Sequence, residues 1–363
     1  MKIITILGTR PEIIRLSIII EKLDIFCDHI LIHTGQNYDY HLNELFFHSL
    51  GVRKPDYFLE VKGKTFGEQI GKILIESEKV ILKEKPDAIL ILGDTNSGLT
   101  SIIAKRLGIL VYHLEAGNRC YDNRVPEEVN RRIIDHSSDI FMPYTNRSKD
   151  NLVREGIPRE KIYVIGNPIF EVIQHYNKKI DNSDIITKLG LEANKYFLVT
   201  MHRAENVDIP QRLHNLIRSL ELLFEEFNYP IICSLHPRTK NKIEKYNITT
   251  KIKNIHFLTP LDFFDFVKLE KNAFLVLTDS GTVQEECCIF NKPNITIRDV
   301  TERPETIEAG SNLITGNNPK NILDCAKMAL KLDSYWKPPD EYLITNVSEI
   351  VSKIIFGFNE NII

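Results

Sequence analysis

Short apolar runs recur along the chain, and each ends at a small group of polar residues. The run Lys2–Leu7 leads to Gly8, Thr9 and Arg10, after which a stretch with apolar residues at helical spacing begins. Further runs of this kind occupy His29–His33, Ala88–Leu92, Ile109–His113, Asp139–Met142 and Ile162–Ile165. Continuous apolar strands that alternate with amphipathic helices predict a parallel sheet covered by helices on both faces.

The second half of the chain repeats this pattern. Strands are expected at Tyr196–Met201, Pro230–Leu235, Ala273–Thr278 and Asn294–Ile297, with a helix from about Pro210 to Phe227. We therefore expect an α/β protein of two Rossmann-like, doubly wound domains that face a cleft. The first domain is expected over residues 1–167 and the second over residues 168–346, with a C-terminal helix within residues 347–363 that packs back on the first domain.

Composition and charge exclude several classes of protein. The chain has 363 residues, of which 43% are hydrophobic and 26% charged, as in soluble globular proteins. The net charge of −3 gives no reason to expect a nucleic acid as a partner. The six cysteines have no CxxC spacing, which indicates reduced thiols rather than disulfides or a zinc site. Without a signal peptide or a membrane-spanning run, we expect a cytoplasmic protein with no membrane partner.

A dense group of charged residues lies between Leu114 and Asp135. It follows the run Ile109–His113, passes through a turn and enters a helix after Pro126, a residue that fits the first helical turn. Glu127 and Arg131 are four residues apart on this helix and share a face. Carboxylates and guanidinium groups at a strand end suit proton transfer beside an anionic substrate. An ordinary surface ion pair between these two residues is an equally good explanation.

Other candidate residues also stand at the ends of predicted strands. Asp94 and Glu115 each come directly after an apolar run, where a carboxylate is costly unless it is paired or functional. Asp94 could alternatively cap the next helix. His202 and His236 each close a strand, and a lone buried histidine is more often structural than catalytic.

A phosphate site is predicted where Ser280, Gly281 and Thr282 join a strand to a helix. The free backbone N–H groups of a helix N-terminus bind phosphate, and Arg10 can add a bidentate contact. The simpler alternatives are a plain helix cap at Ser280 and an ion pair between Arg10 and Glu12. Because all of these groups are expected at one cleft, we favour diphosphate binding.

Several cofactor motifs are missing from the sequence. It contains neither G-x-G-x-x-G nor G-x-x-x-x-G-K-[ST], so it carries no sign of a dinucleotide or Walker phosphate loop. We expect no cofactor and no metal. Proton transfer or group transfer by Asp94, Glu115, Glu127 and His202 is therefore favoured over redox chemistry.

Eight segments of the chain resemble the non-hydrolysing UDP-N-acetylglucosamine 2-epimerase family. They span nearly the whole chain in order and are GTRPE (8–12), HTGQNYD (33–39), LGDTNS (92–97), EAG (115–117), PEEVNR (126–131), HRAEN (202–206), TDSGTVQEE (278–286) and RDVTERPE (298–305). The resemblance implies a fold like that of GT-B glycosyltransferases, with a UDP-sugar substrate held mostly by the second domain. It also implies a homodimer, which is usual in the family.

The resemblance further implies a reaction and roles for individual residues. Such enzymes are thought to invert C2 of the sugar by eliminating UDP across C1–C2 to a glycal and adding it back on the other face. Asp94, Glu115 and Glu127 would then move the proton, and His202 would aid departure or binding of UDP. The substrate-binding residues implied are Arg10, Arg15, Arg131, His236, Phe266, Ser280, Gly281, Glu286 and Arg303. Within that set Glu286 would hold the ribose hydroxyls, Phe266 would lie near the uracil, and Arg131 would support the carboxylates.

Departures from the family pattern leave the sugar open. Arg15 stands where the family often has lysine, Thr282 replaces a glycine, and Ala204 replaces an arginine. The segment GNRCYDNRVPEE (117–128) resembles most the branch that forms UDP-N-acetyl-L-fucosamine from its C2 epimer. Three further alternatives are a GT-B glycosyltransferase, a hydrolysing relative that releases free N-acetylmannosamine, and a nucleotide-sugar-binding regulator without turnover.

Overall fold

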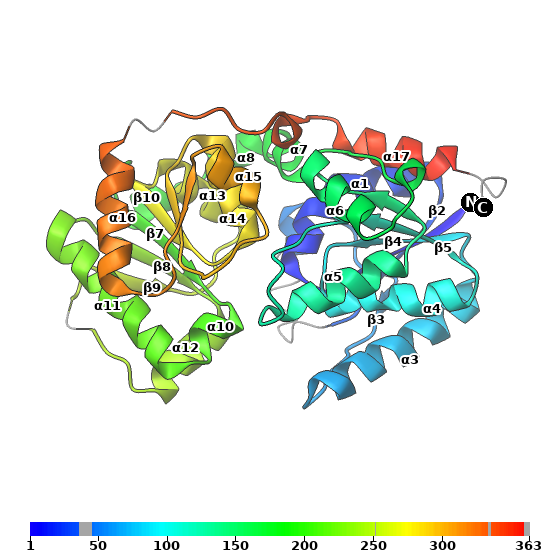
Figure 1. The fold of residues 1–363 in the computed structure, drawn as a ribbon, viewed down its shortest axis with the longest axis horizontal. Coiled ribbons are helices and arrows are strands. Elements are labelled where there is room, and N and C mark those ends of the chain that lie inside the picture. The colour runs from blue at the N-terminus through cyan, green and yellow to red at the C-terminus, as the bar shows by residue number, and fades with distance from the viewer. Residues whose placement is uncertain (36–45, 251, 333–334, 359–363) are drawn as a thin grey trace. The chain divides into compact units, whose positions relative to one another are not determined.

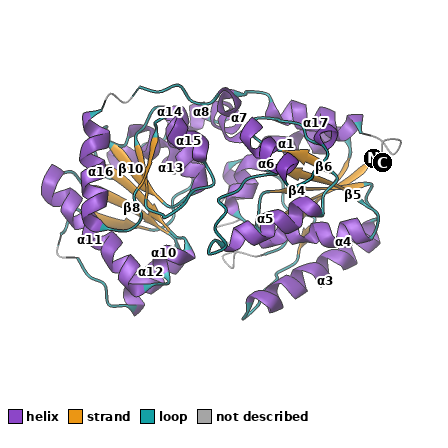
Figure 2. Ribbon diagram, in the orientation of Figure 1, coloured by secondary structure: helices purple, strands orange, loops and turns teal. Residues whose placement is uncertain are grey.

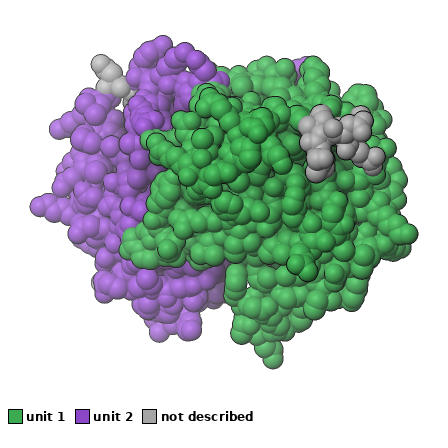
Figure 3. Space-filling view, turned by 45° about the vertical axis from the view of Figure 1, so that its right-hand side comes forward, with its two compact units in different colours: residues 1–174, 341–363 green, residues 175–340 purple. Residues whose placement is uncertain are grey.

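The computed structural model describes residues 1–35, 46–250, 252–332 and 335–358. It divides into two compact units, which Figure 3 shows in separate colours. Unit 1 comprises Met1–Gln174 and Glu341–Ile363, and unit 2 comprises His175–Asp340. The domain boundaries predicted from the sequence were at residues 167 and 346.

Unit 1 is built on a six-stranded sheet in the order β3-β2-β1-β4-β5-β6, in which every pair of neighbours is parallel. The strands are β1 Lys2–Leu7, β2 Asp28–His33, β3 Tyr57–Phe58, β4 Ala88–Leu92, β5 Leu110–Leu114 and β6 Ile140–Met142. Its helices are α1 Arg10–Phe26, α3 Phe66–Glu84, α4 Ser101–Arg106, α5 Pro126–His136, α6 Asn146–Arg154, α7 Pro168–His175 and α17 Val347–Gly357, with short 3-10 turns at Asn96–Thr100, Arg159–Lys161 and Asp340–Leu343. Helices cover both faces of the sheet, as Figures 1 and 2 show.

Unit 2 has a second six-stranded parallel sheet in the order β12-β11-β10-β7-β8-β9. The strands are β7 Phe197–Met201, β8 Ile231–Leu235, β9 Ile255–Leu258, β10 Leu275–Thr278, β11 Asn294–Thr296 and β12 Asn312–Ile314. The helices are α8 Asn177–Asp181, α9 Ile185–Lys188, α10 Ala204–Val207, α11 Pro210–Phe227, α12 Pro237–Lys245, α13 Phe263–Asn272, α14 Gly281–Phe290, α15 Pro304–Glu308 and α16 Pro319–Lys331.

Counted within each unit, both sheets have the doubly wound strand order 3-2-1-4-5-6. The predicted fold class, α/β with Rossmann-like sheets, is therefore confirmed. In this order the chain runs outward in opposite directions from the first and fourth strands, and the carboxyl ends of those two strands form the usual ligand site. The pair is β1 and β4 in unit 1, and β7 and β10 in unit 2.

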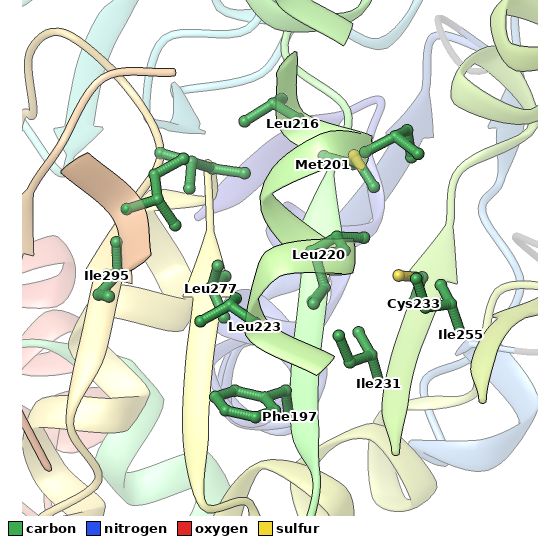
Figure 4. Packing of buried hydrophobic residues seen from close by; sticks show 14 of the residues in the cluster. Phe197, Met201, Leu216, Leu220, Leu223, Ile231, Cys233, Ile255, Leu277 and Ile295 are labelled. Atoms are coloured by element: carbon green, nitrogen blue, oxygen red, sulfur yellow. The ribbon is translucent and has the colours of Figure 1, made fainter. Parts of the chain in front are cut away.

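The core of unit 2 shows why these segments form buried strands (Figure 4). Leu216, Leu220 and Leu223 recur at helical spacing on α11 and pack against apolar side chains of the sheet. Phe197 on β7 and Leu277 on β10 are almost fully buried in the same cluster. Strands buried on both faces have no polar positions to alternate, so they appear in the sequence as continuous apolar runs.

The predicted strand at Ile162–Ile165 is wrong. Tyr163 and Ile165 donate backbone hydrogen bonds to Phe141 and Pro143, but the ladder is limited to one isolated bridge between Phe141 and Ile162. Conversely, the strands β3, β9 and β12 were missed. All three are short edge strands, and β9 carries exposed His256 and Phe257, so none of them appears as a continuous apolar run.

The C-terminal helix α17 belongs to unit 1 and packs against α1. The rings of Phe26 and Phe356 meet edge to face with centroids 6.2 Å apart. The hydroxyl of Tyr112 on β5 donates to the Ile355 carbonyl at 3.2 Å. In the part of the chain that the structure describes, no helix has the length and apolar character needed to cross a membrane.

Candidate active site

In unit 1 the carboxyl ends of β4 and β5 gather paired carboxylates and arginines. Asp94 follows β4 and is held by Arg131 of α5, whose Nε and Nη2 lie 2.8 and 2.6 Å from Asp94 Oδ2. Arg131 also donates from Nη1 to Glu128 at 2.9 Å. Asp94 therefore does not act as a simple helix cap, because its carboxylate faces a guanidinium from another helix.

Glu115 follows β5 and forms the second carboxylate of this group. Its Oε2 lies 2.5 Å from Arg15 Nη1 and 3.3 Å from the Tyr144 hydroxyl, and Asn118 donates to its Oε1 at 2.9 Å. Both members of the ion pair are buried, with Arg15 3% and Glu115 8% exposed. Glu115 has a φ of +64°, a left-handed conformation that is unfavourable for a glutamate and is typical of functional sites.

Gly93 brings the two carboxylates together. A Cβ at Gly93 would lie 3.5 Å from Glu115 Oε2, so the Glu115 carboxylate lies beside the residue that precedes Asp94. The Gly93 carbonyl is bonded by His113 Nε2 at 2.9 Å, and His113 Nδ1 pairs with the buried Asp135 at 2.8 Å. The structure therefore joins Asp94, Glu115, Arg15 and Arg131 in one group.

Glu127 lies on the same helix as Arg131 and is half-buried. The ion pair between Arg131 and Asp94 connects the helix to the end of β4, and a second ion pair joins Arg131 to Glu128 within the helix. Glu128 is fully buried and also accepts the backbone N–H groups of Cys120 and Tyr121. Burial opposes its ionisation, but these bonds and Arg131 lower the pKa of Glu128 below its ordinary value. Glu128 therefore holds the turn that precedes α5.

Glu12 bridges the ends of β1 and β4 in unit 1. Its Oε2 accepts from Gly8 N at 2.9 Å and from the Thr9 hydroxyl at 2.8 Å, while its Oε1 accepts from the Thr95 hydroxyl at 3.0 Å. Burial raises the pKa of Glu12 to about 7 despite these three bonds. This residue ties together the two loops that carry Arg10 and Asp94.

Arg10 begins α1, and its guanidinium carbon lies 5.7 Å from the centroid of the Phe46 ring. Of the motif HTGQNYD, the residues from Gln36 to Asp39 lie outside the described part of the chain. Arg10 is therefore placed at the end of β1, as expected from the sequence.

In unit 2 a buried aspartate organises the ends of β7 and β10. Asp279 follows β10 and accepts the backbone N–H groups of His202 and Arg203 at 2.9 and 3.0 Å. Its Oδ1 lies 3.0 Å from His202 Nδ1, and Asn206 Nδ2 lies 3.2 Å from its Oδ2. Burial would raise the pKa of Asp279, but the His202 side chain and the backbone N–H groups lower it to about 2. The histidine is consequently fixed by its side chain and by its backbone.

The N-terminus of α14 combines three of the predicted substrate-binding residues. Ser280 occupies the N-cap position of α14. All residues of this helix are described, and the Ser280 side chain makes no capping hydrogen bond to them. A Cβ at Gly281 would lie 3.6 Å from the guanidinium carbon of Arg303. Arg303 is in turn held by the buried Glu285 through its Nε. A helix N-terminus beside a fixed guanidinium suits a phosphate group.

Glu286 and Phe266 lie on neighbouring helices of unit 2. Glu286 is on α14 and is 3% exposed. Phe266 is on α13, half-buried, and packs on a core cluster that includes Leu198, Val276 and Val283. The two residues therefore lie on helices that pack against each other.

His236 caps the N-terminus of α12. Its Nδ1 accepts the backbone N–H of Arg238 at 3.2 Å and caps α12. Its ring centroid is 6.4 Å from that of His202. The side chain therefore lies next to the histidine that Asp279 fixes.

The sequence analysis did not identify the residues that hydrogen-bond to the candidate site residues or to the loops that carry them. Asp279, Glu12 and Tyr144 had no assigned role, although Asp279 directly follows an apolar strand as Asp94 does. That position was the available signal for Asp279. Tyr144 and Glu12 have no equivalent signal, because their partners come from distant parts of the sequence. Among the described residues no group of His, Cys, Asp and Glu has the arrangement of a metal site.

Comparisons with known proteins give a consistent result. The model of the family described as UDP-N-acetylglucosamine 2-epimerase matches residues 22–355. A UDP-N-acetylglucosamine 2-epimerase of Methanococcus maripaludis is 41% identical over 363 residues, covering 98% of each chain. One from Methanocaldococcus jannaschii is 44% identical over 347 residues, covering 93% of this chain and 95% of the relative. The crystal structure of a Methanocaldococcus jannaschii UDP-GlcNAc 2-epimerase, in complex with UDP-GlcNAc and UDP, matches with a TM-score of 0.94 and 41% identity, over 99% of this chain and all of that one.

Proposed function

The chain belongs to the UDP-N-acetylglucosamine 2-epimerase family, and on that premise we propose that it inverts C2 of a UDP-N-acetylhexosamine. The observation that carries this proposal is the pair of arginine-bound carboxylates, Asp94 and Glu115, on either side of Gly93 at the strand ends of unit 1. The reaction is an isomerisation of the UDP-GlcNAc to UDP-ManNAc type.

The chemistry of C2 explains why such a site is needed. The C2–H is not acidic, because no carbonyl lies next to it. Elimination of UDP across C1–C2 gives a glycal, and re-addition of UDP with a proton delivered to the other face of C2 gives the epimer. This route requires groups that remove and return a proton, and groups that stabilise UDP as it leaves and returns.

Unit 1 supplies the proton-transfer groups in this proposal. Asp94, Glu115 and Glu127 are the acid–base candidates, with Arg131 and Arg15 holding the first two. Arg15 takes the place of a lysine that is common in the family, and it pairs with Glu115 as a cation should. The strained backbone of Glu115 is in keeping with a residue whose position is set by the reaction.

Unit 2 supplies the UDP-binding groups. Ser280, Gly281 and Arg303 would bind the diphosphate, and His202 would assist UDP departure. Arg10, at the end of β1 in unit 1, is a further candidate for a phosphate contact. Glu286 would hold the ribose hydroxyls, and Phe266 would lie near the uracil. His236 would contact the substrate next to His202.

A second candidate substrate is the UDP-N-acetyl-L-fucosamine pair of C2 epimers. The observation that favours it is the turn at residues 117–128. There the side chains of Asp122 and Arg124 pair with each other, and Cys120 contacts Glu128 at 3.4 Å. This turn leads directly into α5, which carries Arg131, so its sequence can influence which sugar is accepted.

The experiment that tests the proposal is proton NMR of the purified protein in D₂O, with UDP-GlcNAc and UDP-N-acetyl-L-fucosamine in separate tubes. Deuterium at C2 together with a new epimer signal supports epimerisation and identifies the sugar. Exchange with UDP-N-acetyl-L-fucosamine alone would assign the second candidate. The matched control is Glu76→Gln, which alters an exposed carboxylate paired with Lys79 on α3.

Other outcomes would replace the proposal. UDP and free sugar as final products would indicate a hydrolysing relative. Sugar transfer to an added acceptor without C2 exchange would indicate a GT-B glycosyltransferase. Binding of UDP without any turnover would indicate a nucleotide-sugar-binding regulator.

We also propose a cytoplasmic location and a homodimeric state. The cysteines of the described residues are all free thiols, as expected in a reducing compartment. Sedimentation of the purified protein measures the oligomeric state directly.

A further inference from the structure

We propose that Glu270 is a positioning residue for Glu286, and that it acts as a buried neutral carboxylic acid which donates its proton to the Glu286 carboxylate. This inference rests on the proposed function, in which Glu286 holds the ribose hydroxyls of UDP. Glu270 was not among the residues singled out by sequence, and no step of the reaction uses it.

Glu270 lies beside a second carboxyl group, and no Lys, Arg or His side chain of the described residues acts on its carboxyl group. Glu270 lies at the end of α13 and is fully buried. Its Oε1 accepts the Cys287 thiol at 3.2 Å. Its Oε2 is buried and receives no hydrogen bond from a described donor. The other titratable group that acts on it is Glu286 on the facing helix α14, through a side-chain hydrogen bond.

These contacts require a proton between the two carboxyl groups. Two carboxylates cannot hydrogen-bond to each other, because both are acceptors. A buried carboxylate that has no cation and has a second carboxyl beside it is strongly disfavoured. Burial first, and then Glu286, raise the pKa of Glu270 well above its ordinary value. Burial likewise raises the pKa of Cys287, so the thiol remains a donor.

The position of the pair explains which residue keeps the proton. Glu286 is on α14, whose N-terminus carries Ser280 and Gly281, so its carboxylate is on the helix that faces the nucleotide in the proposed function. Glu270 lies behind it on α13, next to the apolar cluster of Tyr196, Leu269 and Cys287. A proton on Glu270 leaves the Glu286 oxygens as acceptors for two ribose hydroxyls and prevents the side chain from rotating away.

Nucleotide discrimination measures this role directly. Isothermal titration calorimetry gives the dissociation constants of UDP and 2′-deoxy-UDP, which differ by one ribose hydroxyl. A hydrogen bond from that hydroxyl to a charged group predicts a preference of about tenfold or more for UDP in the unaltered protein. Glu270→Met removes the proton donor while keeping the volume, and we expect the preference to fall below about threefold. Glu270→Gln keeps a neutral donor, and we expect the preference to remain.

A matched control and a second readout separate positioning from mere packing. Cys287→Ala perturbs the same contacts, so it should lower stability but keep the preference for UDP. At about pH 8.5, where Glu12 is ionised, an infrared band of a buried protonated carboxyl should be present in the unaltered protein. The band should be missing in Glu270→Met and in Glu270→Gln. This second measurement uses Glu270→Gln alone if Glu270→Met does not fold.

Each contrary outcome has its own meaning. An unchanged preference in Glu270→Met, a lost preference in Glu270→Gln, or the lack of the infrared band would overturn the role of Glu270. Binding of UDP without discrimination against 2′-deoxy-UDP would overturn the ribose contact and this inference with it. Absence of UDP binding by the unaltered protein would overturn the proposed function itself.

Discussion

The two units place a buried carboxylate at the same topological position and treat it in opposite ways. In unit 1 Glu12 joins the ends of β1 and β4, and in unit 2 Asp279 joins the ends of β7 and β10. Glu12 accepts from two hydroxyls and one backbone N–H, and its pKa is about 7. Asp279 accepts from two backbone N–H groups, an amide and an imidazole, and its pKa is about 2.

This difference shows that the strand order decides where such a carboxylate lies, while its donors decide its charge. Neutral hydroxyl donors do not offset the burial of Glu12, whereas the imidazole of His202 and the backbone N–H groups offset that of Asp279. In both units the bridging residue holds a loop that carries a candidate active-site residue, Asp94 in unit 1 and His202 in unit 2. The two units therefore share a strand order and differ in the hydrogen-bond donors and the pKa of the carboxylate at the strand ends.

The largest effect is expected from Asp94→Asn in unit 1. The amide cannot accept a proton from C2, so the rate of C2–deuterium exchange should fall by about 10²–10⁴-fold. UDP affinity, which the proposal assigns mainly to unit 2, should change by less than about threefold. Proton NMR in D₂O and calorimetry measure the two quantities. A loss of UDP affinity as large as the loss of exchange rate would contradict the proposal that unit 1 transfers the proton and unit 2 binds UDP.

A large loss of stability is expected from Arg15→Met. The substitution leaves Glu115 buried without its guanidinium, which should cost about 3–5 kcal/mol of unfolding free energy. Arg15→Lys is the matched control, because it keeps the positive charge at the same site, and we expect it to retain most of the stability. Urea unfolding at neutral pH measures both variants. Equal stability of Arg15→Met and Arg15→Lys would contradict the ion pair.

The two bridging carboxylates should respond to pH in opposite directions. Folded Glu12 keeps its proton to about pH 7, whereas an unfolded glutamate releases it near 4.5, so its contribution to stability falls as pH rises between these values. The loss is about 3 kcal/mol, and Glu12→Gln should abolish it. Asp279 contributes about 2 kcal/mol above its ordinary pKa of 3.8, and this contribution is lost as pH falls toward 2.

Urea titrations of the unaltered protein and of Glu12→Gln from pH 4 to pH 8 measure the first effect. Acid unfolding of the unaltered protein and of Asp279→Asn measures the second. Parallel pH profiles for the unaltered protein and Glu12→Gln would show that the Glu12 carboxyl is not shifted.

The smallest effect is expected from Ser280→Ala. Because this side chain makes no capping bond, unfolding free energy should change by less than about 0.5 kcal/mol. A lost phosphate contact should weaken UDP binding by about fivefold. The matched control is Asn318→Ala, which removes a real cap on α16 in the same unit and should cost about 1 kcal/mol without weakening UDP binding. The reverse result would make Ser280 a structural residue.

The sequence predicted the central strands of both sheets but not the edge strands β3, β9 and β12, nor the residues that hold the site residues in place. Continuous runs such as Ala88–Leu92 and the helix Pro210–Phe227 were located because burial on a sheet or along a helical face imposes a simple period. Strand ends also gave the positions of Asp94, Glu115 and His202. The edge strand β12 was missed because its three residues include two that are only partly buried.

Pairings between distant residues could not be read from one sequence. Arg15 and Glu115 are separated by 100 positions, and His202 and Asp279 by 77. A period or a motif describes neighbours along the chain, whereas these contacts depend on which loops meet at a sheet edge. The same holds for Glu270, whose carboxyl partner is on the next helix rather than on its own.

The return of the chain to unit 1 has a consequence for synthesis on the ribosome. Val347, Val351 and Ile355 of α17 are fully buried, so the first unit cannot complete its packing until α17 has been made. The intervening stretch of roughly 170 residues takes tens of seconds to translate at ordinary speeds. Unit 2, which is continuous in sequence from His175 to Asp340, has no such delay. The part of the protein that is translated first is therefore the part that is finished last.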